Sequence, residues 1–446
     1  MKVVKVLKTG LVVAAAWLAG LSCVHAETVS GGRYGDVELA RPSGALRGFV
    51  VLFSNRSGWS HADQDAAEAL ARNGAMVVGV DLPRYAAKLA TIRGEACHPL
   101  VGDAENVSHQ LQREVESSQY FSPILAGTGE GALLAERMLA QAPDNTLAGA
   151  VAIDPDTTLD ERFNLCAPDP ALSRAPGLPG FLELGATDGT TVKPPEPKKK
   201  APPIVVHKLD KGATTIDSLV ALMEPHLQQR DSGADSVADL PLIELPAAHP
   251  GDMLAVVISG DGGWRDLDKT IAETLQKQGV SVVGVDSLRY FWTPKSPEQT
   301  SHDLARILDR YSTRWHARHF ALVGYSFGAD VMPFAYNRLP DALRDKVSFI
   351  SLLGFAHAAD FQIRVSGWLG LPPSERALNV APEIARVPAS RVQCIYGADE
   401  DDTLCPSLAA SGVAVVRTAG GHHFTKDYVA LTKTILDGWK AQPDMH

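Results

Sequence analysis

The chain of 446 residues is 45% hydrophobic, which supplies a sizeable core and excludes an intrinsically disordered protein. Its 38 glycines and 29 prolines are too few for a collagen-like or low-complexity chain. The formal net charge of −10 argues against direct nucleic-acid binding, because a nucleic-acid binder needs a basic face. The length suggests two or three domains.

The first 26 residues have the pattern of a cleavable signal peptide. Three lysines precede an apolar run over residues 11–21, and the segment 24–26 (VHA) supplies small residues before a cleavage point. The apolar run is shorter than the ~20 residues of a membrane-spanning helix. A retained anchor and a lipoprotein attached through Cys23 are the less favoured alternatives. We therefore expect an exported protein that is soluble after cleavage.

Four cysteines lie after the signal peptide: Cys97, Cys166, Cys394 and Cys405. In an oxidising compartment four cysteines allow three pairings. Nearness in the sequence favours Cys97–Cys166 and Cys394–Cys405, one bridge in each half of the chain. Two buried free thiols are the alternative for the second pair.

Two long segments of the chain repeat each other at a constant offset of 205 residues. Residues 48–85 match residues 253–290, with Trp59 opposite Trp264, and the run VVGVD occurs in both segments. A period this long indicates a duplicated domain, because solenoid repeats are much shorter.

The sequence pattern of each copy predicts a strand, a glycine-bearing loop, an amphipathic helix and a second strand, which together form a βαβ unit. Another apolar strand then leads into a glycine-rich turn and a helix. We therefore predict two tandem α/β-hydrolase-like domains with mainly parallel sheets. The first half comprises residues 27–228, a polar linker covers 229–236, and the second half comprises residues 237–446. Residues 194–203 (PPEPKKKAPP) are predicted to form a mobile surface loop.

A nucleophile motif lies in the second half. The sequence GYSFG at residues 324–328 follows a predicted strand and precedes a helical run, which is the setting that a GxSxG nucleophile elbow requires. The glycines permit a tight turn that exposes the hydroxyl of Ser326. GxSxG by itself is a weak signal, and a structural turn serine is the alternative. The setting favours Ser326 as a nucleophile.

A serine nucleophile needs a base, which should follow it in the chain. The turn GGHHF at residues 420–424 comes after a short predicted strand, and its glycines allow an imidazole to return over the elbow. We predict His422 as the base, with His423 as the alternative.

The acid that orients the base should come from the loop before that strand. Residues 399–402 are four consecutive acids that follow a predicted strand. Asp402 is preferred, because it lies four residues before a proline, whereas Asp399 and Asp401 remain open. A disulfide between the flanking cysteines would hold this loop in place.

The oxyanion hole should use the amide of Phe327 and a second donor from the glycine loop at residues 259–264. Gly262 and Gly263 are the predicted contributors, and a plain tight turn is the alternative. The spare carboxylates of Asp261, Asp399 and Asp401 are candidates for binding a cationic substrate.

The first half lacks these groups. Its elbow, residues 127–131, has Gly129 at the serine position, and the counterpart of the histidine turn, residues 211–214, contains no histidine. The counterpart of the oxyanion loop, residues 55–59, keeps one glycine. We therefore expect the first half to be catalytically inert and to serve binding, shielding or stability.

The motifs SGDGGWRDLD, VVGVDSLRYFW, GYSFGAD and GGHHF closely resemble the VirJ family of bacterial virulence proteins, and the two-copy length resembles its longer, AcvB-like members. The resemblance implies a periplasmic α/β-hydrolase that removes the aminoacyl group from lysyl- or alanyl-phosphatidylglycerol. It places the family's nucleophile on Ser326 and its catalytic histidine on His422.

The resemblance also links the chain to virulence and to type IV secretion. The expected partners are an aminoacylated phospholipid at the membrane surface and components of a secretion system. A serine hydrolase needs no metal or organic cofactor, and the sequence has no HExxH, CxxC or GxxxxGK[ST] motif that would hold one. The competing hypothesis is a periplasmic adaptor or chaperone for secretion substrates.

Overall fold

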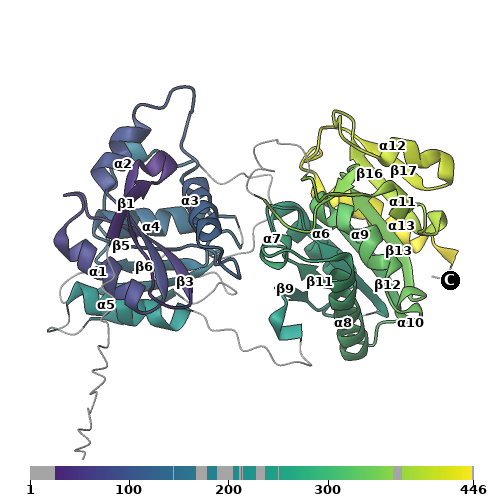
Figure 1. Cartoon of the computed structure of the whole chain (residues 1–446), viewed down its shortest axis with the longest axis horizontal. Helices are drawn as coiled ribbons and strands as arrows, with labels where there is room; N and C mark the ends of the chain where they lie inside the picture. The colour runs from purple at the N-terminus through teal and green to yellow at the C-terminus, as the bar shows by residue number, and fades with distance from the viewer. Residues whose placement is uncertain are drawn as a thin grey trace, which may run out of the picture.

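A computed structural model describes residues 26–143, 145–166, 178–187, 204–209, 212, 214–227, 237–249, 251–364 and 374–443. The predicted signal peptide, the linker over residues 229–236 and the loop over 194–203 lie outside the described residues. Two separate mixed sheets, each with helices on both faces, form the two parts of the molecule (Figure 1). The predicted α/β architecture in two copies is confirmed.

The first sheet contains eight strands in the order β1-β2-β4-β3-β5-β6-β7-β8. β1 and β2 form an antiparallel pair, β2 runs antiparallel to β4, and the strands from β4 to β8 are parallel. The strands are β1 (Ala26–Ser30), β2 (Asp36–Ala40), β3 (Gly48–Phe53), β4 (Ala75–Val80), β5 (Ile124–Thr128), β6 (Gly149–Ile153), β7 (Phe181–Ala186) and β8 (Ile204–Lys208).

The second sheet repeats this order without the first strand. It reads β9-β11-β10-β12-β13-β16-β17, with β9 antiparallel and the others parallel. The strands are β9 (Leu242–Leu245), β10 (Met253–Ile258), β11 (Ser281–Val285), β12 (His319–Tyr325), β13 (Val347–Leu353), β16 (Val392–Gly397) and β17 (Ala414–Thr418). A small separate pair joins β14 (Ala358–Ala359) to β15 (Leu378–Asn379).

Helices cover both faces of each sheet. In the first half these are α1 (His61–Arg72), α2 (Leu82–Leu89), α3 (Leu100–Glu114), α4 (Glu130–Gln141) and α5 (Thr215–Met223). In the second half they are α6 (Asp266–Lys277), α7 (Ser287–Tyr290), α8 (Pro297–Trp315), α9 (Phe327–Asn337), α10 (Asp341–Arg344), α11 (Ala381–Ile384), α12 (Cys405–Leu408) and α13 (Tyr428–Lys440).

The apolar core of each half is divided by its sheet into two layers. In the first half α2, α3 and α4 pack on one face and α1 and α5 on the other. In the second half α8 and α9 cover one face, while α6 and α13 cover the opposite one. The central strands are buried on both sides, which is why they read as continuous apolar runs in the sequence.

Both predicted disulfides are present. Cys97 is bonded to Cys166 in the first half, and Cys394 is bonded to Cys405 in the second. Within the part of the chain that the structure describes, no helix is both long enough and apolar enough to cross a bilayer.

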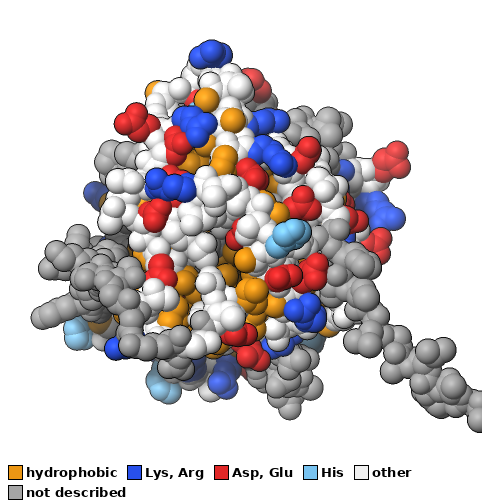
Figure 2. Space-filling model, turned by 90° about the vertical axis from the view of Figure 1, so that its left-hand side faces the viewer, with side chains coloured by type: hydrophobic (Ala, Val, Ile, Leu, Met, Phe, Trp, Pro, Cys, Tyr) orange, Lys and Arg blue, Asp and Glu red, His pale blue; other side chains and the backbone are white. Residues whose placement is uncertain are grey.

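The two halves contact each other through α3 and the segment that follows it (Figure 1). Tyr120 lies in the core cluster of the second half, with its ring 4.9 Å from that of Trp292. The guanidinium of Arg113 lies 3.6 Å from the centre of the Trp292 ring, and the Trp292 indole donates to the carbonyl of Ser117 at 3.0 Å. Basic and acidic side chains are interspersed on the face of the first half that is turned away from the second half (Figure 2).

Candidate active site

Ser326 occupies the sharp turn between β12 and α9. Its backbone has φ 51° and ψ −119°, a conformation that side-chain-bearing residues rarely adopt and that a nucleophile elbow requires. The Ser326 amide donates to the Leu353 carbonyl at 2.8 Å, which ties the turn to the neighbouring strand β13. The sheet therefore holds the serine where β12 ends, as the sequence predicted.

His422 lies over this serine. Its Nε2 is 2.8 Å from the Ser326 Oγ, and its Nδ1 is 2.6 Å from Oε1 of Glu400. An ionised carboxylate only accepts hydrogen bonds, so Nδ1 carries the proton and Nε2 is free to accept from the hydroxyl. His423 instead places Nδ1 2.8 Å from the Tyr325 hydroxyl, and burial lowers its pKa. The structure thus brings His422, and not His423, to Ser326.

The acid beside the histidine is Glu400, and the prediction of Asp402 is wrong. The Glu400 side chain is 5% exposed, whereas that of Asp402 is 77% exposed and lies 3.9 Å from His357. Asp399 and Asp401 are also exposed. The cause is a tight turn directly after β16, in which the Glu400 amide donates to the Gly397 carbonyl at 3.1 Å. This turn directs residue 400 inward, and residue 402 lies beyond it.

The loop that carries Glu400 is fixed at several points. The Cys394–Cys405 disulfide joins β16 to α12 across it, and the Leu404 amide donates to the Phe355 carbonyl at 2.8 Å. The Asp399 amide donates to the carbonyl of Gly420 at 2.9 Å, which links the acid loop to the histidine turn. The acid and the base are therefore held by a common framework.

Sequence reasoning missed Gly354, which follows β13. A Cβ at this position would lie 2.8 Å from Cε1 of His422 and 3.2 Å from Oε1 of Glu400. Any larger residue would displace the imidazole. The available signal was a glycine directly after the apolar run of residues 347–353, at the edge where parallel strands end.

The glycine loop after β10 lies beside the serine. A Cβ on Gly260 would lie 3.7 Å from that of Ser326. The prediction that Gly263 contributes an oxyanion donor is wrong, because its amide already donates to the Gly260 carbonyl at 3.1 Å in a tight turn. Gly262 lines the cavity, and its carbonyl accepts from Nε of Arg265 at 2.8 Å. Available donors are thus the Phe327 amide at the start of α9 and the amides of residues 260–262.

A cavity of about 380 Å³ opens over the serine. Among the predicted substrate-binding carboxylates, Asp261 lines it, whereas Asp399 and Asp401 do not. The cavity contains side chains of both charges, since Asp266, Arg265 and Lys426 also line it. The full lining is Gly260, Asp261, Gly262, Gly263, Arg265, Asp266, Leu267, Asp268, Tyr325, Ser326, His422, His423, Lys426 and Tyr428. Within the described ranges, no group of three or more His, Cys, Asp or Glu side chains could hold a metal ion.

The corresponding turn of the first half has nearly the same backbone conformation but carries no nucleophilic side chain. Gly129 has φ 55° and ψ −120°, nearly the values of Ser326. A Cβ on Gly129 would lie 2.8 Å from Oδ1 of Asn55, so the asparagine occupies the space that a serine side chain would need. A cavity of about 440 Å³ remains beside Gly129. Residues 211–214, the counterpart of the histidine turn, lie only partly within the described residues.

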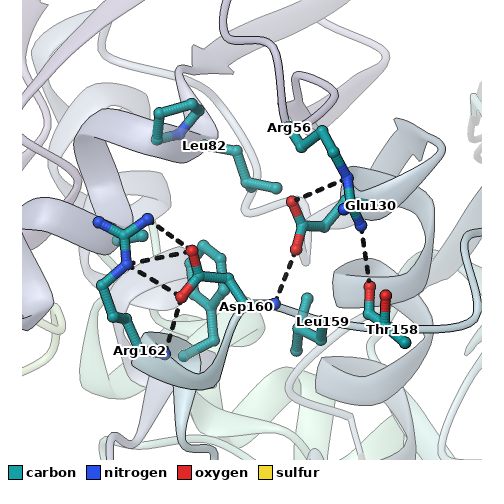
Figure 3. Close-up of a pocket in the computed structure, with 10 residues that line it drawn as sticks. Arg56, Leu82, Glu130, Thr158, Leu159, Asp160 and Arg162 are labelled. Atoms are coloured by element: carbon teal, nitrogen blue, oxygen red, sulfur yellow. Dashed lines mark hydrogen bonds and ion pairs between the residues drawn. The ribbon is translucent and has the colours of Figure 1, made fainter.

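Beside this turn, charged side chains of the first half bind one another (Figure 3). Glu130, the counterpart of Phe327, is buried and accepts from the Asp160 amide at 2.7 Å. Arg56 lies 3.8 Å from the Glu130 carboxylate and donates to the carboxylate of Asp156 and the carbonyl of Thr158, at 2.8 and 3.3 Å. Where the second half has a glycine loop beside a nucleophile, the first half has a network of ion pairs.

Several solved structures of hydrolases are similar to this chain. Est1E from Butyrivibrio proteoclasticus, with bound ferulic acid, is 14% identical, covers 46% of this chain and 95% of its own, and has a TM-score of 0.33. XC6422 from Xanthomonas campestris, described as an α/β serine hydrolase without a lid, is 13% identical, with coverages of 46% and 95% and a TM-score of 0.31. The esterase Pf2001 from Pyrococcus furiosus is 12% identical, with coverages of 48% and 96% and a TM-score of 0.33.

No curated protein matches the chain. A family model described as "Bacterial virulence protein (VirJ)" matches residues 252–443, a range that contains the serine, the histidine and the glutamate described above. The match lies in the second half of the chain, and this half is therefore similar to the VirJ family of bacterial virulence proteins.

Proposed function

We propose that this protein is a serine hydrolase in which Ser326, His422 and Glu400 form the catalytic triad. The observation that carries the proposal is the pair of hydrogen bonds through one imidazole, 2.8 Å to the serine and 2.6 Å to the glutamate. A serine hydroxyl is a weak nucleophile until a neighbouring base activates it, and the base needs a partner that fixes its tautomer. All three groups are present in the second half.

In this mechanism the Oγ of Ser326 attacks the ester carbonyl while Nε2 of His422 takes the hydroxyl proton. Glu400 holds the proton on Nδ1 and stabilises the imidazolium that forms. The amide of Phe327 and an amide of residues 260–262 stabilise the oxyanion. His422 then gives its proton to the departing alcohol, which leaves an acyl-enzyme. A water molecule, activated by the same imidazole, releases the acid and restores the serine.

We propose the aminoacyl ester of lysyl- or alanyl-phosphatidylglycerol as the substrate. The resemblance to the VirJ family suggests it, and the charges around the cavity suit it. Asp261 and Asp266 would attract the ammonium groups of an amino acid, and Lys426 would attract the lipid phosphate. The two disulfides fit an exported protein, since disulfides persist in oxidising compartments. We therefore propose a periplasmic location and a link to virulence.

The test is hydrolysis of lysyl-phosphatidylglycerol in vesicles, with release of free lysine as the measurement. The wild-type protein should release lysine, and Ser326→Ala should not. Ser312→Ala, which changes a half-buried serine on α8 whose hydroxyl donates to the Asp309 carbonyl, is the matched control and should keep full activity. Release of lysine by Ser326→Ala at a rate within a few-fold of wild type would reject the proposed function. Activity on a small soluble ester without activity on the lipid would reject only the substrate.

A further inference from the structure

One side chain of the first half reaches the wall of the catalytic cavity. Glu105, on α3, forms a two-pronged ion pair with the guanidinium of Arg265, which lines the cavity. The Glu105 side chain is 12% exposed and that of Arg265 is 32% exposed, so the pair is largely shielded from water. A charge pair in this setting is stronger than one on an open surface.

Arg265 also holds the glycine loop. Its Nε donates to the carbonyl of Gly262 at 2.8 Å, while the other nitrogens of the same guanidinium face Glu105. The guanidinium is planar and rigid, so fixing one edge with a carboxylate fixes the direction of the other edge. The Gly262 carbonyl belongs to the loop in which a Cβ on Gly260 would lie 3.7 Å from that of Ser326, and whose amides are the proposed oxyanion donors. A continuous chain of contacts thus runs from the first half to the oxyanion donors.

The repeated sequence shows that an arginine is not required at this position to begin the helix. Its counterpart in the first half is Ser60, whose hydroxyl caps α1 by accepting from the Asp63 amide. Arg265 stands at the same N-cap position of α6 and supplies no side-chain cap. Loss of such a cap typically destabilises a helix by about 1 kcal/mol, and a cation at a helix N-terminus is also unfavourable. A role of Arg265 outside the helix would explain why an arginine occupies a position where it supplies no cap and where a positive charge is unfavourable.

The remaining contacts between the halves keep α3 in place independently of Glu105. The ring of Trp292 packs against Tyr120 and Arg113, and its counterpart in the first half is Ala87. Arg289 donates to the Ser122 hydroxyl at 2.8 Å. The second copy thus has a tryptophan where the first copy has an alanine, whereas Arg289 matches Arg84 of the first copy. Both Trp292 and Arg289 contact the first half.

We propose that Glu105 is a positioning residue for hydrolysis: through Arg265, the first half holds the loop of residues 260–263 in its catalytic geometry. This inference rests on the proposed function of Ser326. It assigns the inert half a direct part in the rate of the reaction, beyond binding, shielding or stability. A small misplacement of a catalytic group by a distant change can lower a rate by up to about 100-fold.

The experiment compares full-length Glu105→Ala and Glu105→Gln with wild type, using a p-nitrophenyl ester and lysyl-phosphatidylglycerol vesicles. We expect kcat to fall by roughly 10-fold in Glu105→Ala with KM within about twofold, because the oxyanion loop stabilises the transition state more than the bound substrate. The rate at which a fluorophosphonate labels Ser326 should fall in parallel. Ser122→Ala removes another contact between the halves and is the matched control, expected to stay within about twofold of wild type.

A double-mutant cycle tests whether Glu105 acts through Arg265. Arg265→Ala should lower kcat by at least as much as Glu105→Ala, and the double variant should be no slower than Arg265→Ala alone. Circular dichroism and thermal unfolding establish that each variant is folded. Effects that multiply in the double variant would overturn the proposal, as would an equal loss in Ser122→Ala or unchanged kcat in Glu105→Ala.

Ser326→Ala, measured beside these variants, separates the two proposals. If Ser326→Ala is inactive and Glu105→Ala is normal, the proposed function stands and the role of Glu105 is rejected. If Ser326→Ala still turns over substrate, the proposed function fails and the role of Glu105 fails with it.

Discussion

The two halves of this protein share a framework and differ in the few side chains that we propose to perform chemistry. Their sheets have the same strand order, and the turns at Ser326 and Gly129 have nearly the same backbone angles. Each half also buries a tyrosine that donates to an aspartate at 2.6 Å, Tyr85 to Asp103 and Tyr290 to Asp303. The comparison shows that packing of the sheet maintains the elbow geometry, whether or not a nucleophile is present.

The loss of chemistry in the first half is more than the loss of one hydroxyl. Asn55 fills the space above Gly129. Arg56 lies beside the carboxylate of Glu130 (Figure 3) and donates to that of Asp156. A single reversion would therefore restore neither the base nor an open oxyanion loop. The following variants test how far the two halves can be made alike.

Ser326→Gly makes the active turn a copy of Gly129 and should have the largest effect. We expect turnover to fall by about 10⁴-fold or more, because covalent catalysis is lost and only oxyanion and binding contributions remain. The melting temperature should change by less than about 3 °C, since a glycine already occupies this backbone conformation in the first half. Esterase kinetics and calorimetry measure both. A melting temperature lowered much further would mean that Ser326 supports the fold.

Glu400→Gln should have the next largest effect. Replacing the carboxylate by an amide removes the charge that fixes the Nδ1 proton of His422, and we expect kcat to fall by about 10²- to 10⁴-fold. The matched control is Asp402→Asn, which changes an exposed acid two residues away and should stay within about twofold of wild type. A greater loss in Asp402→Asn than in Glu400→Gln would show that the acid has been assigned incorrectly.

Removal of the disulfide in the second half should lower activity, whereas removal of the disulfide in the first half should not. The Cys394–Cys405 bridge closes the loop that carries Glu400, so the double serine variant should lose several-fold in kcat and about 3 kcal/mol of stability. The Cys97–Cys166 bridge closes 69 residues in the first half, and its removal should destabilise that half by about 4 kcal/mol. At a temperature where the first half remains folded, the variant that lacks the Cys97–Cys166 bridge should keep the kcat of the wild type. Equal activity losses at that temperature would contradict this difference between the halves.

Gly129→Ser should have the smallest effect on activity. Introduced into Ser326→Gly, it should restore no measurable esterase activity, because no histidine lines the cavity beside residue 129 in the described part of the first half. Its Cβ would lie 2.8 Å from Oδ1 of Asn55, so we expect a loss of about 1 kcal/mol of stability. Restored turnover in this double variant would mean that the first half retains catalytic groups.

The sequence alone was sufficient for the framework and for two members of the proposed triad. The 205-residue repeat predicted two α/β domains, and the settings of GYSFG and GGHH predicted that Ser326 and His422 would meet. It was not sufficient for the acid. Four consecutive acids offer the same chemistry, and the choice among them is made by one backbone turn between Gly397 and Glu400.

Contacts between the halves also could not be predicted from the sequence. Glu105 and Arg265 are 160 residues apart and lie on helices whose relative placement depends on how two complete sheets pack. Nothing in the local pattern of α3 distinguishes Glu105 from other acids on a solvated helix. The one signal in the sequence for this contact is Arg265, which stands where the first copy has the helix-capping Ser60.

We propose that only one half of this duplicated fold carries out the chemistry. Its most direct test is labelling of the full-length protein with a fluorophosphonate, followed by peptide mass mapping. We predict one label per chain, on Ser326, with no label on any serine of residues 27–228 and none on folded Ser326→Ala. A label in the first half, or an active folded enzyme that takes no label on Ser326, would show that the chemistry is not carried by Ser326 alone.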